Sequence, residues 1–126
     1  MPFIHIKSLP LDGGLSVSDI VEGISRDFSE QVGIEIEQVT ATWEGLSSWH
    51  YAAAGRAAAN QPNNSHPILV DLLVPDFYPP DLVEKMLTSV AASISKRAGV
   101  SDHNIFINLR LARSGQVFDA GEIVRW

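Results

Sequence analysis

The order of apolar and polar residues predicts a strand followed by a helix at the start of the chain. Apolar and polar side chains alternate over residues 2–8, as they do in a strand. We expect a helix to begin at Ser16 or Ser18, because apolar residues then recur at helical spacing until Gly33, a natural helix stop. Residues 37–43 are rich in β-branched and apolar side chains and predict a second strand.

The second half of the chain predicts the same elements in the same order. Residues 67–74 are almost continuously apolar, which is typical of a central strand covered on both faces. Pro79 and Pro80 favour the start of a helix, whose apolar stripe continues to Gly99. Alternating residues 104–112 then predict the last strand.

The two halves correspond closely enough to indicate an internal duplication. The matched positions are Pro2 with Pro67, Pro10 with Pro75, Gly33 with Gly99, and Gly55 with Gly121. We interpret residues 2–55 and 67–121 as two copies of one unit within a single domain of residues 1–126. The segment of about 44–66 is an insertion, and we expect its Ala-rich run to form helical turns.

Two fused β-α-β units predict an α/β (α+β) fold with one four-stranded mixed sheet. Each strand-helix-strand connection is expected to be right-handed, which puts both helices on one face of the sheet. The other face then lacks a cover within the chain. We expect copies of the chain to cover it in a homo-oligomer with closed symmetry, a trimer.

Composition narrows the chemistry that the chain can perform. The absence of cysteine excludes disulfides and thiolate nucleophiles, and the four histidines lack metal-ligand spacing, so we expect no metal and no cofactor. A net charge of −6 with only nine Lys and Arg argues against nucleic-acid binding. No stretch approaches the roughly 18 apolar residues of a membrane span, and no secretory signal is evident. We expect no membrane contact and a cytoplasmic protein.

Pro2 is the residue best suited to catalysis. Removal of the initiating methionine would leave a secondary amine at position 2 instead of an amide. An α-amino group has a pKa of about 8, and burial in an apolar pocket lowers that pKa because it disfavours the charged form. An amine that titrates near neutral pH is an efficient general acid-base group. We therefore expect Pro2 to carry protons.

With Pro2 followed at once by a strand, and with a duplicated β-α-β frame, nearly the whole chain resembles the tautomerase superfamily. Segments 49–55 (WHYAAAG) and 117–121 (VFDAG) look like two versions of a turn that, in 4-oxalocrotonate tautomerase, lends an aromatic side chain to the pocket. The resemblance therefore adds His50 and Tyr51 to the candidate site, with Pro2 as the catalytic residue.

The last predicted strand resembles the Tyr-Ile-Asn segment of macrophage migration inhibitory factor. That resemblance implies that Asn108 hydrogen-bonds a substrate oxygen and that Phe106, which lacks a hydroxyl, shapes the pocket. The arginines that fix carboxylates in the assayed members are missing from their usual places. The remaining candidates to bind an anionic group are Arg110, on the strand face of Asn108, Arg56 in the insertion, and Arg113. A solvent-exposed or interface role is the alternative for Arg110.

Asp71 interrupts an apolar strand, where an unpaired carboxylate is costly. For Asp71 we favour a structural partner across the sheet or at a subunit boundary over a role in catalysis.

Three functions remain open. The first is a tautomerase, or isomerase, in which Pro2 is the general base for keto-enol proton transfer on a small anionic carbonyl compound. The second is a decarboxylase or hydratase in which protonated Pro2 is a general acid. The third is a non-catalytic oligomeric module, which retention of Met1 would favour because an acylated proline nitrogen is not a base.

Overall fold

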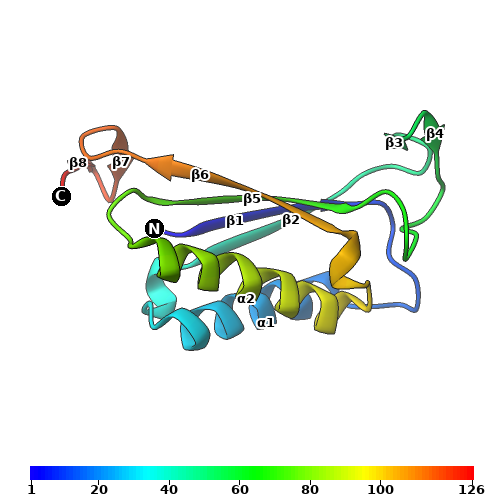
Figure 1. Cartoon of the computed structure of the whole chain (residues 1–126), viewed down its shortest axis with the longest axis horizontal. Coiled ribbons are helices and arrows are strands. Elements are labelled where there is room, and N and C mark those ends of the chain that lie inside the picture. Colours follow the sequence, from blue (N-terminus) through cyan, green and yellow to red (C-terminus); the bar gives the residue numbers. More distant parts are fainter.

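In the computed structural model, which describes all 126 residues, two helices cover one face of a four-stranded sheet (Figure 1). The strand order is β2-β1-β5-β6, and the two central strands are antiparallel. Each outer strand is parallel to its central neighbour. The predicted α+β fold of two β-α-β units is therefore confirmed. The bounds are β1 Phe3–Ser8, α1 Val17–Val32, β2 Thr40–Gly45, β5 Ile68–Pro75, α2 Pro80–Ala98 and β6 Ile105–Ala112, with single 3₁₀ turns at Ile36–Gln38 and Asp102–Asn104.

Both helices begin and end where the sequence predicts. Ser16 caps α1, with its hydroxyl oxygen accepting a hydrogen bond from the Asp19 amide at 3.3 Å. Pro79 and Pro80 occupy the cap and the first turn of α2. Gly33 and Gly99 both adopt left-handed backbone angles, with φ of 72° and 71°, and so terminate the two helices in the same way. Neither helix is both long and apolar enough to cross a bilayer.

The core lies between the helices and the sheet, and the opposite sheet face has no cover within the chain (Figure 1). Fully buried side chains come from both strands and helices, among them Ile4, Ile6, Phe28, Leu72 and Ile94. Burial alternates along β5, so only one face of residues 67–74 is buried. The second face of β5 lacks a packing partner within one chain, so the cover predicted for that face would have to come from another copy of the chain. We call this face the open face.

The second strand begins three residues later than the predicted residues 37–43 and ends two residues later. Backbone hydrogen bonds from Gln38 to Glu35 and from Val39 to Ile36 close a 3₁₀ turn before it. The strand begins at Thr40, whose amide donates to the carbonyl of Pro2 at 3.0 Å. Pairing with β1 thus sets this boundary, and β-propensity does not.

Two short hairpins extend from opposite ends of the sheet (Figure 1). One pairs β3 Ala52–Ala53 with β4 Arg56–Ala57, and the other pairs β7 Val117–Asp119 with β8 Glu122–Val124.

Each hairpin turns through an Ala-Gly pair with positive φ at both residues. The angles are 51° and 76° at Ala54 and Gly55, and 50° and 86° at Ala120 and Gly121. Two central residues with positive φ match the twist of a tight hairpin. The expected helical turns in the Ala-rich run are therefore wrong, because the turn geometry outweighs the helix preference of alanine.

Candidate functional site

Pro2 lies immediately before β1 and is held by burial of its ring and by one backbone hydrogen bond. Its side chain is fully buried, and its carbonyl accepts the hydrogen bond from the Thr40 amide. With Met1 in place, the nitrogen of Pro2 is an amide and has no basic lone pair. Removal of Met1 would therefore leave a secondary amine whose position is set by strand pairing.

Two side chains flank this end of the chain. The terminal ammonium group of Met1 donates a hydrogen bond to Oε1 of Gln38 at 3.1 Å. Burial lowers the pKa of this terminal amine, and the carboxylate of Asp119 on β7 opposes that shift. Neither Gln38 nor Asp119 was a site candidate from the sequence. The only available signal was the position of Asp119 inside the VFDAG segment, since Gln38 lies in a turn that was predicted to be strand.

The open face carries one polar row across all four strands. His5 stands opposite Thr42 on β2 and opposite Asp71 on β5, and Asp71 stands opposite Asn108 on β6. The imidazole of His5 contacts the Thr42 hydroxyl and lies 3.3 Å from the carboxylate of Glu44. On one side of this row the central strands carry two apolar residues, Phe3 and Leu73. On the other side they carry Lys7 and Leu69, and Leu69 faces Phe106.

The structure brings Phe106, Asn108 and Arg110 together on the open face, as their alternation predicts. Arg110 is in the row of Phe3, next to Pro2. Phe106 is in the row of Lys7, roughly 13 Å further along the strands. Within one chain, Arg110 is therefore the predicted binding residue nearest to Pro2.

Two adjoining hollows lie on this face and share His5 and Asp71. One, of about 290 Å³, is also lined by Phe3, Leu73 and Arg110. The other, of about 300 Å³, is lined on the β6 side by Phe106 and Asn108. Apolar walls with a few polar groups are typical of sites for small organic molecules.

His50, Tyr51 and Arg56 lie around the β3–β4 hairpin, at the opposite end of the sheet from the N-terminus (Figure 1). The Tyr51 hydroxyl donates to the carbonyl of Pro67 at 2.8 Å, and burial raises its pKa. The side chains of His50 and Arg56 form no hydrogen bond or ion pair within the chain, and both residues are exposed. A single chain therefore does not bring these three residues to Pro2.

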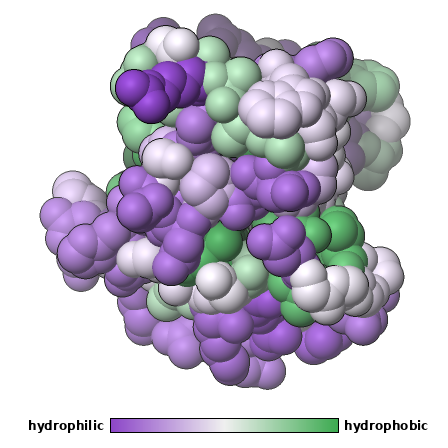
Figure 2. Space-filling model, turned by 90° about the vertical axis from the view of Figure 1, so that its right-hand side faces the viewer, coloured by the Kyte–Doolittle hydropathy of each residue, from purple (hydrophilic) through white to green (hydrophobic).

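The surface at that end mixes hydrophilic and hydrophobic side chains and presents no single apolar face (Figure 2). A hollow of about 500 Å³ at this end, lined by Leu11, Leu15 and Val100 among others, contains none of the predicted site residues.

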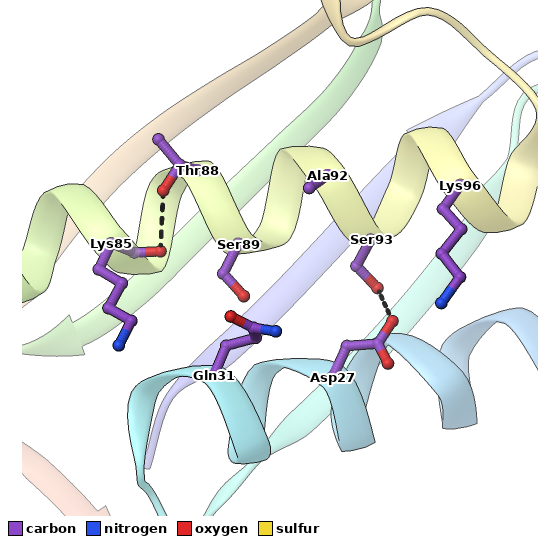
Figure 3. A pocket seen from close by; sticks show the side chains of 8 residues that line it. All are labelled: Asp27, Gln31, Lys85, Thr88, Ser89, Ala92, Ser93 and Lys96. Atoms are coloured by element: carbon purple, nitrogen blue, oxygen red, sulfur yellow. Dashed lines mark hydrogen bonds between the residues drawn. The ribbon is translucent and has the colours of Figure 1, made fainter.

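A separate hollow of about 380 Å³ lies between the two helices, with the sheet behind them (Figure 3). Its lining is almost entirely polar, and Ser93 donates a hydrogen bond to Asp27 at 2.6 Å. Hydrogen bonds from Arg97 hold the pKa of Asp27 at about 2, against the opposing effect of burial. These contacts join the helices, so we assign the hollow to structure. No three His, Asp or Glu side chains anywhere come together as a metal site would require.

Comparisons with known proteins identify the fold. No family model matches the sequence, and no curated protein matches it. Among solved structures, Pt0534 inactivated by 2-oxo-3-pentynoate is 14% identical, with a TM-score of 0.80 over 97% of this chain and 94% of that chain. A fused 4-OT wild-type symmetric trimer is 12% identical, with a TM-score of 0.80 over 96% of this chain and 94% of that chain.

Macrophage migration inhibitory factor from Oncomelania hupensis is 9% identical, with a TM-score of 0.75 over 98% of this chain and 97% of that chain. At such low identities the likeness establishes the fold alone. The fold is that of the tautomerase superfamily, as the resemblance in the sequence predicted.

Proposed function

Because the chain has the tautomerase-superfamily fold, we propose that it is an isomerase in which Pro2, freed by removal of Met1, is the general base of a keto-enol proton transfer. The observation that carries this proposal is the setting of Pro2. Its ring is fully buried and its carbonyl is tied to β2. A rigidly held amine whose charged form is disfavoured by burial is suited to accept and return a proton near neutral pH.

The proton transfer conserves atoms and electrons. The lone pair of the Pro2 nitrogen removes a proton from the carbon next to a carbonyl, and the electrons of that bond move to the oxygen and give an enolate. The protonated amine then returns the proton at another position of the same molecule. Asn108, and in the nearer row Arg110, are the proposed donors to the oxygen that carries the charge. No external cofactor takes part in these steps.

The proposed substrate is a small anionic carbonyl compound. The hollow beside Phe3 and Leu73 offers apolar walls for its carbon skeleton. Arg110 borders the same hollow, and its guanidinium group can bind a carboxylate through two parallel hydrogen bonds. This combination favours a carboxylate-bearing enol over a neutral one.

The proposed assembly is a homotrimer that covers the open face. Support comes from the uncovered sheet of a single chain and from the similar fused 4-OT structure, which is a trimer. His50, Tyr51 and Arg56 lie at the far end of the sheet from Pro2 (Figure 1). They could enter the pocket of Pro2 only from another copy of the chain.

The position of Asp119 near the terminal amine favours a second candidate function. In this function Pro2 stays protonated and is the general acid of a decarboxylase or hydratase. A carboxylate near the terminal amine stabilises the charged form and raises the pKa of that amine. Burial is the larger effect, and it lowers the pKa. We therefore prefer the role of base. Retention of Met1 would instead leave a non-catalytic oligomeric module.

Covalent labelling tests the proposed amine directly. A neutral Pro2 nitrogen should add to 2-oxo-3-pentynoate at the alkyne carbon remote from the ketone, and the proton should end on the neighbouring carbon. Mass spectrometry should then find one added reagent on the peptide that begins with Pro2. A form that retains Met1 is the matched control and should carry no label on the Pro2 nitrogen. Equal labelling of both forms, or a label on another residue, would contradict the proposal.

A further inference from the structure

Asp71 contacts Asn108 and Arg110, the two polar side chains that we place at the substrate. Its Oδ1 atom accepts a hydrogen bond from Nδ2 of Asn108 at 3.3 Å. The same oxygen lies 3.8 Å from Nε of Arg110. One carboxylate oxygen on the central strand β5 therefore contacts two neighbouring side chains of the edge strand β6.

The carboxylate of Asp71 interrupts an otherwise apolar strand. Leu69 and Leu73 flank Asp71 on the open face, and its register neighbour on β1 is His5. The side chain is 39% exposed in one chain. An apolar residue would pack there at lower cost if the position only had to bury surface. The contacts to Asn108 and Arg110 are the ones that a carboxylate provides and a leucine does not.

The contact fixes the orientation of the Asn108 amide. An ionised carboxylate only accepts hydrogen bonds, so the NH₂ group of Asn108 must face Asp71. The second N–H of that group stays free to donate to a substrate oxygen. In Arg110, Nε faces Asp71, and the two terminal nitrogens stay free to bind a carboxylate side by side.

We infer that Asp71 is a positioning residue, which orients Asn108 and Arg110 to bind the carbonyl oxygen and the carboxylate of a 2-oxo acid or its enol. This inference rests on the proposed function. Asn108 and Arg110 are two residues apart on the same face of β6, so their Cα atoms are about 6.5 Å apart. Their side chains border the two hollows that share Asp71. A 2-oxo acid carries its two oxygen groups on adjacent carbons, and the long side chain of Arg110 can reach toward Asn108 to hold both.

A double-mutant cycle tests this role on the enol phenylenolpyruvate. Asp71→Leu should lower kcat/KM by about tenfold, since both donors lose their orientation. Asn108→Ala should have a similar effect. The double variant should lose less activity than the two single losses combined, because part of the effect of Asp71 passes through Asn108 and only the rest passes through Arg110. Glu44→Gln is the matched control, since it removes one charge from the same face at the opposite edge, and it should change kcat/KM less than twofold.

Asp71→Asn keeps an oxygen that can accept from Asn108 and should restore most of the activity that Asp71→Leu loses. Additive losses in the double variant, or equal losses in Asp71→Asn and Asp71→Leu, would overturn the inference. Circular dichroism and chain association must be unchanged in each variant that is compared.

The binding of phenylpyruvate, measured by titration calorimetry, separates this inference from the proposed reaction. If the wild-type protein binds phenylpyruvate but turns over no enol, the proposed catalysis fails, and the inference still requires about tenfold weaker binding in Asp71→Leu. Unchanged binding in that variant, or no binding to the wild-type protein, would overturn the inference itself.

Discussion

Arg97 of α2 donates two hydrogen bonds to the carboxylate of Asp27 on α1. Its Nε and Nη2 atoms each lie 2.8 Å from one of the two carboxylate oxygens. Ser93 donates a further hydrogen bond to the same carboxylate (Figure 3). Both side chains of the ion pair are about three-quarters buried. The ion pair joins the two helices on the side away from the sheet. It therefore helps to hold the helix layer against the sheet that contains β1.

We expect this pair to contribute to stability above about pH 4 and to lose its effect in acid. The pKa of Asp27 in the folded protein is about 2, below the ordinary value of 3.8, so folding favours the ionised form. The contribution is therefore present above pH 3.8 and disappears as the pH falls through about 2. Asp27→Asn should lower the free energy of unfolding by about 1 to 2 kcal/mol at pH 7. Urea unfolding at pH 7 and pH 2 measures this difference, which should shrink in acid.

Gly23→Ala provides an independent control for the same pair. A Cβ atom at Gly23 would clash with Nη1 of Arg97, so the guanidinium group would have to move. Alanine is the better helix former by about 1 kcal/mol, which partly offsets the lost ion pair. The variant should nevertheless show the weakened acid dependence of Asp27→Asn. An acid dependence equal to that of the wild-type protein in either variant would contradict the assignment.

The open face leads to a prediction about assembly. Light scattering should give three times the chain mass of 13.7 kDa. Phe106→Asp should shift the protein toward smaller species, because this side chain is 58% exposed in one chain and would be covered in a trimer. Leu15→Asp, which changes a 43% exposed residue outside the sheet, is the control and should leave the mass unchanged. A stable monomer of the wild-type protein would contradict the predicted trimer.

Local signals were sufficient to predict the fold from the sequence. Ser16, Gly33 and Gly99 mark helix ends through contacts with residues a few positions away, and the alternation in residues 104–112 predicts the exposed face of β6 correctly. The sequence-based predictions failed where contacts between distant segments determine the local structure. Thr40 starts its strand because it bonds to Pro2, a contact between residues far apart in the chain.

The candidate site was only partly predictable for the same reason. Phe106, Asn108 and Arg110 share a face because they alternate along one strand, which the sequence reveals. Gln38 and Asp119 reach the N-terminus from separate elements, so no local pattern places them there. Their positions depend on how the sheet and the second hairpin are assembled around β1.

Enol ketonisation by two forms of the protein tests the central claim most directly. The form that begins with Pro2 has a free secondary amine, whereas the form that retains Met1 has an amide at the same position. The free-amine form should accelerate ketonisation of phenylenolpyruvate, with a rate that rises with pH as the amine loses its proton. The Met1 form should be slower by a factor of about a hundred to ten thousand, the usual cost of losing a general base. Equal rates from the two forms would contradict the role of Pro2.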